Sequence, residues 1–165
     1  MAALEAGKSA PFFSLPLVAG GNFSLADWLR EGPAVLAFFK ISCPVCQFAF
    51  PYLERIHQAA KGKSVAILGI SQNSREDTAK FAREYGITFP IALDDPRSYP
   101  ASNAYGITNV PTVFYVAEDA KIEISSVGWS KEDLERIARM VGEQAPAAKF
   151  EFLRPGEEVP AYRAG

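Results

Sequence analysis

Two apolar runs of strand length enclose a segment with helical periodicity. The runs are residues 33–39 ("PAVLAFF") and 64–71 ("SVAILGIS"), and the segment between them extends from residue 43 to about residue 60. Continuous apolar strands are typical of a sheet that is covered on both faces. The pattern predicts two parallel strands joined by a right-handed helical crossover.

The rest of the chain predicts further elements around this unit. Residues 10–25 predict two short strands about a Gly20–Gly21 turn, followed by a helical turn that Ser24 caps. Five further elements follow. They are a helix over residues 74–86, capped by Ser74 and ended by Gly86, a short strand (89–95), a short helix (98–106), a hairpin (111–129) and a last helix (130–143) capped by Ser130. This order favours a central mixed sheet with helices on both faces.

Composition narrows the class of protein. With 165 residues, 48% of them apolar, the chain suits one domain with its own core and needs no disulfide framework. The net charge of −2, with both signs interspersed, argues against a nucleic-acid partner. No apolar run is long enough to span a membrane, and the N-terminus lacks a secretory signal. We therefore expect a cytoplasmic protein, or a periplasmic or extracytoplasmic one if a leader has been removed.

The only two cysteines, Cys43 and Cys46, lie where the first strand turns into the helix. A thiol at a helix N-terminus faces unpaired backbone N–H groups and the positive end of the helix dipole, which both stabilise the thiolate. Pro44 suits the first helical position, which needs no N–H. Cys46 follows one turn later, within reach of Cys43. Thiol–disulfide exchange needs this combination of an accessible thiolate and a second thiol that resolves the mixed disulfide.

Two other interpretations of the cysteine pair are weaker. A pair of small buried apolar residues does not account for the C-x-x-C spacing at a strand–helix junction. A zinc site needs two further ligands, and the only nitrogen donor is His57, far along the same helix. We read His57 as a helix-surface residue and expect no metal site.

Taken together, these motifs resemble the thioredoxin-like thiol–disulfide oxidoreductases, in the redoxin branch related to cytochrome-maturation reductases and peroxiredoxins. The "CPVC" junction, Pro51 inside the helix, the loop "GITNVPT" and the inserted "YGITFPIALDDP" carry the resemblance, which covers about residues 10–142. It implies an α/β fold: a three-layer sandwich with a central mixed sheet, an N-terminal hairpin and a βα-type insert. Residues 1–145 would form this domain. Residues 146–165, with three prolines, would form a tail that is either draped over the domain or disordered.

The resemblance also implies a site and a reaction. Cys43 would attack a protein or small-molecule disulfide and Cys46 would resolve it, with no cofactor besides the redox-active Cys43–Cys46 disulfide and with an upstream dithiol as reductant. Pro44 and Val45 would contact the substrate. Pro111 would be a cis-proline that packs against Cys43, so that the backbone at Val110 pairs with a substrate strand.

Several positions depart from the family pattern. Relatives hold a carboxylate near the second cysteine, at the positions of Ala37 or Ala49, and an aromatic residue at the position of Ser42. Lys40 lies three residues before Cys43, and we expect it to point into solvent rather than toward the thiol. Asp94, Asp95 and Tyr99 are polar residues of the insert that could line the site, although a solvated turn is the preferred interpretation.

Two other functions compete with disulfide reduction. A thiol peroxidase of the peroxiredoxin type needs a threonine where Lys40 stands and an arginine near Pro111, so the sequence argues against it. A non-enzymatic thioredoxin-fold binding module is disfavoured because both cysteines are present. Turnover of hydrogen peroxide would identify the first alternative, and failure to reduce insulin disulfides would favour the second.

Overall fold

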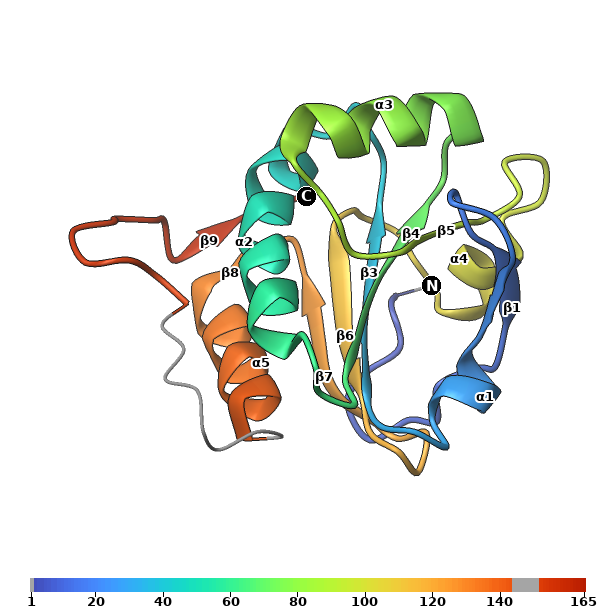
Figure 1. Cartoon of the computed structure of the whole chain (residues 1–165), viewed down its shortest axis with the longest axis horizontal. Coiled ribbons are helices and arrows are strands. Elements are labelled where there is room, and N and C mark those ends of the chain that lie inside the picture. Colours follow the sequence, from blue (N-terminus) through green and yellow to red (C-terminus); the bar gives the residue numbers. More distant parts are fainter. Residues whose placement is uncertain (1, 144–151) are drawn as a thin grey trace.

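The computed structural model describes residues 2–143 and 152–165, and a five-stranded mixed sheet lies at its centre (Figure 1). The strand order is β5–β4–β3–β6–β7, with β3 (Ala34–Phe39), β4 (Ala66–Ser71), β5 (Ile91–Leu93), β6 (Thr112–Val116) and β7 (Ile122–Val127). β3, β4 and β5 are parallel, whereas β6 runs antiparallel to both β3 and β7. The predicted parallel pair on either side of the cysteine-bearing helix is therefore confirmed.

Helices cover both faces of the sheet. One face carries α2 (Pro44–Ala60), α3 (Arg75–Tyr85) and α5 (Lys131–Glu143). The other carries α1 (Leu25–Trp28), α4 (Pro100–Ala104) and the hairpin of β1 (Ser14–Pro16) and β2 (Asn22–Ser24). Side chains of β3 alternate between the two cores, Phe39 toward α2 and Phe38 toward α4, as the pleat of a strand requires. The predicted three-layer α/β sandwich is confirmed.

The predicted helix boundaries have their expected chemical causes. The hydroxyl oxygens of the three predicted capping serines each accept a backbone N–H three residues later: Ser24 from Asp27, Ser74 from Asp77 and Ser130 from Asp133, at 3.2–3.3 Å. Gly86 ends α3 with φ of +67°, a left-handed conformation that favours glycine.

Aromatic packing fixes α2 on the sheet. The ring of Phe50, which is fully buried, lies 4.2 Å from the ring of Phe39 on β3, between centroids. It also lies 5.7 Å from Phe81 on α3 and 5.6 Å from Phe89. Phe50 follows Cys46 by one helical turn, so this cluster holds the cysteine-bearing turn of α2 in place.

The described part of the C-terminal segment lies against the domain. Phe152 is 6% exposed and its ring packs 5.7 Å from Tyr52 and 6.2 Å from Trp129. β9 (Tyr162–Arg163) pairs antiparallel with β8 (Trp129–Ser130), two strands that the sequence pattern did not predict. Residues 152–165 are therefore draped over the domain. The predicted boundary between residues 145 and 146 lies outside the described residues.

Candidate active site

Cys43 is the N-cap of α2, at the end of the loop that follows β3. Its backbone is extended, with φ of −82° and ψ of 116°, and Pro44 occupies the first turn. The N–H of Cys46 donates to the Sγ atom of Cys43 at 3.3 Å, and both cysteines are free thiols. The place of Cys43 between the strand and the start of the helix, and the one-turn spacing to Cys46, agree with the prediction from the sequence.

Two amide side chains position this loop. Asn73 accepts the N–H of Ile41 with its Oδ1 atom at 3.0 Å, and Gln47 donates its Nε2–H to the Ile41 carbonyl at 2.9 Å. Neither residue was predicted from the sequence. Asn73 follows the end of β4, and because the carboxyl ends of parallel strands meet at one edge of the sheet, that placement was a usable signal.

The loop before β6 completes the site. The Val110–Pro111 peptide bond is cis, as predicted. The Cys43 thiol donates to the Val110 carbonyl oxygen, with 3.3 Å between Sγ and O. Thr112 donates its hydroxyl to the Asn109 carbonyl at 2.7 Å, and the N–H of Gly128 donates to the Pro111 carbonyl at 2.7 Å. The loop thus has fixed backbone geometry against the first cysteine.

The site residues differ in exposure. Cys43 is half-buried and Pro44 is exposed, whereas Cys46 is fully buried. Val45 is 8% exposed and packs in the core. Pro44 is therefore the more exposed residue of the "PV" dipeptide.

Cys46 lies in an apolar environment without an acid. Ala37 and Ala49 belong to the same buried cluster as Cys46. Burial, and then the hydrogen bond and charge of Cys43, raise the pKa of the Cys46 thiol far above its ordinary value. The groups that shift this pKa within the described residues are Cys43 and backbone groups, with no carboxylate among them.

The polar residues of the insert lie away from the cysteine pair, and the interpretation of Asp94 as part of a solvated turn is wrong. Asp94 is not in a solvated turn: it is fully buried, and its carboxylate accepts the N–H groups of Ala101 and Ser102 at 3.0 and 2.8 Å. It holds the first turn of α4, on the sheet face opposite α2. Asp95 pairs with Arg97 at the surface.

The exposure of two basic side chains, Lys40 and His57, was also predicted from the sequence. Lys40 is exposed, as expected. His57 is partly exposed on α2, and partial burial lowers its pKa.

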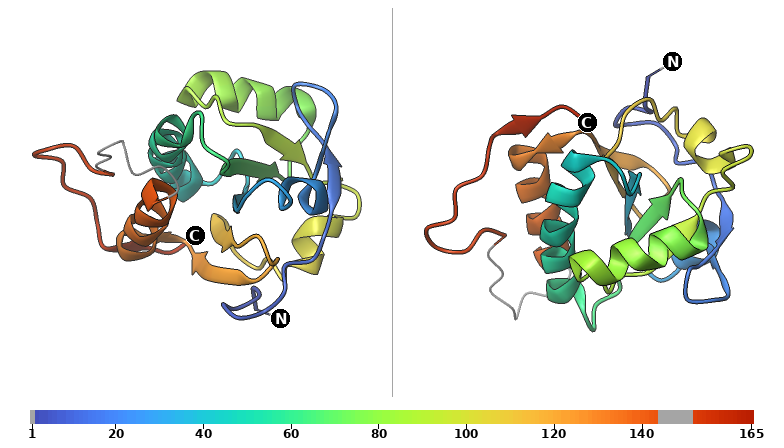
Figure 2. Two further views of the ribbon diagram at one scale, coloured as in Figure 1. Left: turned by 60° about the horizontal axis from the view of Figure 1, so that its bottom comes forward. Right: turned by 90° about the horizontal axis from the view of Figure 1, so that it is seen from above.

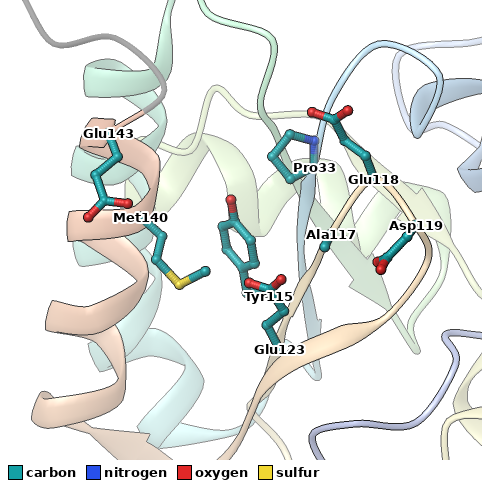
Figure 3. A pocket seen from close by; sticks show the side chains of 8 residues that line it. All are labelled: Pro33, Tyr115, Ala117, Glu118, Asp119, Glu123, Met140 and Glu143. Carbon is teal, nitrogen blue, oxygen red and sulfur yellow. The ribbon is translucent and has the colours of Figure 1, made fainter.

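A separate cavity of about 470 Å³ lies between α5 and the β6–β7 hairpin (Figure 3). Its lining includes Pro33, before β3, and Glu118 and Asp119 in the hairpin turn. Because Cys43 follows the other end of β3, this cavity lies at the opposite edge of the sheet from the thiols. Over residues 2–143 and 152–165, no three His, Cys, Asp or Glu side chains gather where they could hold a metal ion.

A thioredoxin-like sheet with a cysteine pair at the start of α2 and a cis-proline beside it defines the class as the thiol–disulfide oxidoreductases. Residues 6–125 match the model of the AhpC/TSA family, and the chain belongs to that family. The thiol-disulfide oxidoreductase ResA of Geobacillus kaustophilus is 31% identical over 136 residues, which cover 81% of this chain and 76% of the relative. The chain is an oxidoreductase enzyme of this kind.

Solved structures support the same fold. A thiol:disulfide interchange protein of the thioredoxin family from Chlorobium tepidum is 28% identical, with a TM-score of 0.69 and coverage of 84% of this chain and 99% of its own. The thioredoxin domain of a thiol-disulfide oxidoreductase from Bacteroides vulgatus is 24% identical, with a TM-score of 0.74 and coverage of 84% and 99%. In the described residues no helix has the length and apolarity needed to cross a membrane.

Proposed function

We propose that this enzyme reduces disulfides through the Cys43–Cys46 dithiol. The Cys43 thiolate attacks a substrate disulfide and forms a mixed disulfide, and one substrate sulfur leaves as a thiolate that takes up a proton. The Cys46 thiolate then attacks the Sγ atom of Cys43 and releases the second substrate thiol. The substrate gains two electrons and two protons, and the enzyme is left with a Cys43–Cys46 disulfide.

The contact of Cys43 with the Val110 carbonyl carries this proposal. It brings the more exposed thiol, at the N-terminus of α2, to the backbone of the cis-proline loop, 3.3 Å away. A half-buried thiol in this position is accessible to a disulfide. The N–H of Cys46, which donates to the Cys43 sulfur, stabilises negative charge there during attack and departure.

The substrate would bind beside Val110 and Pro111. Backbone groups next to a cis-proline can pair with an extended peptide as an added strand, and Pro44 borders the same thiol. We infer that Pro44, Val110 and Pro111 bind the substrate through backbone pairing and apolar contact.

The redox cycle needs partners and no bound cofactor. An upstream dithiol must reduce the Cys43–Cys46 disulfide after each turnover, so the partners are a disulfide-bearing protein or small molecule and a dithiol reductant. The location stays a prediction: cytoplasmic, or periplasmic or extracytoplasmic if a leader has been removed. A cytoplasmic location would accord with reduction as the direction of the reaction.

Disulfide and peroxide turnover separate this function from peroxidase chemistry. With dithiothreitol as donor, we expect the enzyme to accelerate insulin reduction and to leave hydrogen peroxide consumption at background. Lys40 and Pro111 stand where a peroxidase would have the threonine and the arginine that orient the peroxide, so these two side chains are lacking. Consumption of both substrates is measured at equal enzyme concentration; faster turnover of peroxide than of insulin would contradict the proposal.

A further inference from the structure

The C-terminal residues 152–165, which we call the strap, run along α2 toward the candidate active site. At its start, the Phe152 ring packs on Tyr52. Arg55, one turn further along the same helix, donates from its two terminal nitrogens to the two carboxylate oxygens of Glu157 at 2.8 and 3.0 Å. These contacts fix the first half of the strap to the outer side of α2.

Hydrogen bonds to the backbone of the strap position its second half. The indole N–H of Trp129 donates to the Pro160 carbonyl at 2.7 Å, and the N–H of Lys131 donates to the Ala161 carbonyl at 2.9 Å. β9 continues this pairing, with Arg163 opposite Trp129. The path of the strap is thus set by a short ladder with β8 rather than by exposed side chains.

The end of the strap reaches the cis-proline loop. The guanidinium of Arg163 lies 5.1 Å from the ring centre of Phe48, two residues after Cys46. Gly165 lies directly against Val110: a Cβ atom on Gly165 would overlap the Val110 carbonyl oxygen, the acceptor of the Cys43 thiol. Asn109 donates its Nδ2–H to the Gly165 carbonyl at 3.4 Å. Figures 1 and 2 show the C-terminus beside the first turn of α2 from each direction.

We propose that the strap is a specificity element that occupies the docking edge at Val110, so that extended protein substrates must displace it before they pair there. This inference rests on the proposed function, since it concerns the same site. A second backbone cannot approach the Val110 carbonyl while Gly165 lies against it. Cys43 stays half-buried with the strap in place, so small disulfides reach its sulfur without displacing the strap.

The end of the strap is held by fewer contacts than its start, so it can be displaced. Residues 160–165 are all exposed, and Tyr162 is 59% exposed. The ladder with β8 contains two residues of β9, whereas the anchors at Phe152 and Glu157 lie at the other end. A peptide that competes for Val110 therefore breaks a few hydrogen bonds and leaves the core contacts intact.

Arg163→Pro tests the proposal in the full-length chain. Proline cannot donate to the ladder, so the end of the strap is released while the anchors remain. The measurement is the ratio of kcat/KM for insulin to kcat/KM for hydroxyethyl disulfide, together with hydrogen exchange at the Lys131 amide. We expect the ratio to rise on the order of fivefold, the factor that corresponds to about one net hydrogen bond. Arg163→Ala keeps the N–H and loses only the contact with Phe48, so the ratio should rise less than in Arg163→Pro.

The exchange measurement decides the remaining outcomes. Faster exchange at Lys131 with a raised ratio supports the proposal. Faster exchange with an unchanged ratio overturns it, because the released strap then did not obstruct proteins. Unchanged exchange at Lys131 also overturns it, because the ladder then does not hold the strap. Failure of the proposed function looks different: the wild-type enzyme would reduce neither disulfide.

Discussion

Cys43→Ser will lower the rate of insulin reduction by at least about a thousandfold, because serine oxygen does not attack a disulfide at neutral pH. The fold should survive, since serine is a good N-cap and Cys43 caps α2 through its side chain. The rate is measured by turbidity with a dithiol donor, and circular dichroism of the variant controls for folding.

Cys46→Ala is the matched variant, because alanine keeps the apolar character of a fully buried position. It should react once with a disulfide and then stop as a mixed disulfide at Cys43, which mass spectrometry of the intact protein detects. Full turnover by Cys43→Ser, or no mixed disulfide in Cys46→Ala, would contradict the assignment of roles.

Ala49→Glu is expected to accelerate the resolving step by at least about tenfold at pH 7. Burial raises the pKa of the Cys46 thiol, so below that pKa the reactive thiolate increases about tenfold with each pH unit. Resolution in the wild type should therefore be slow at pH 7 and faster at pH 9. A carboxylate at residue 49, one turn from Cys46 in the same buried cluster, accepts the proton and removes part of this dependence.

Ala49→Gln has a side chain of similar size that is not a base, and it separates proton acceptance from disturbed packing. Both variants place a polar group at a position that is 2% exposed, so each should lose stability by about 1–3 kcal/mol. The measurement is the rate at which a preformed mixed disulfide releases its thiol between pH 7 and 9. Equal rates for Glu and Gln across this range would show that proton loss from Cys46 does not limit resolution.

Local patterns in the sequence were enough to predict where the cysteine pair lies in the fold. The position of Cys43 follows from an apolar strand that ends just before a segment with helical periodicity, and these signals involve neighbours in the chain. The cis conformation of Val110–Pro111 came from the resemblance of its whole loop to a family. A proline before a strand gives no such indication by itself, and the contact with Cys43 spans 67 positions.

Contacts that depend on tertiary structure were missed. Asp94 has the sequence environment of a surface turn, yet it is buried because its carboxylate satisfies two N–H groups at the start of α4. The strap has no apolar periodicity, and β9 pairs through only two residues with a strand more than 30 positions earlier. Neither pattern length nor composition indicates such pairing.

The order in which the two thiols react tests the central claim most directly. The reduced protein is treated at pH 7 with limiting iodoacetamide, and the modified peptides are quantified by mass spectrometry. The account predicts that Cys43, half-buried at the N-terminus of α2, is labelled first, with Cys46 at least about tenfold slower because burial keeps it protonated. Preferential labelling of Cys46 would contradict the account and reverse the two roles.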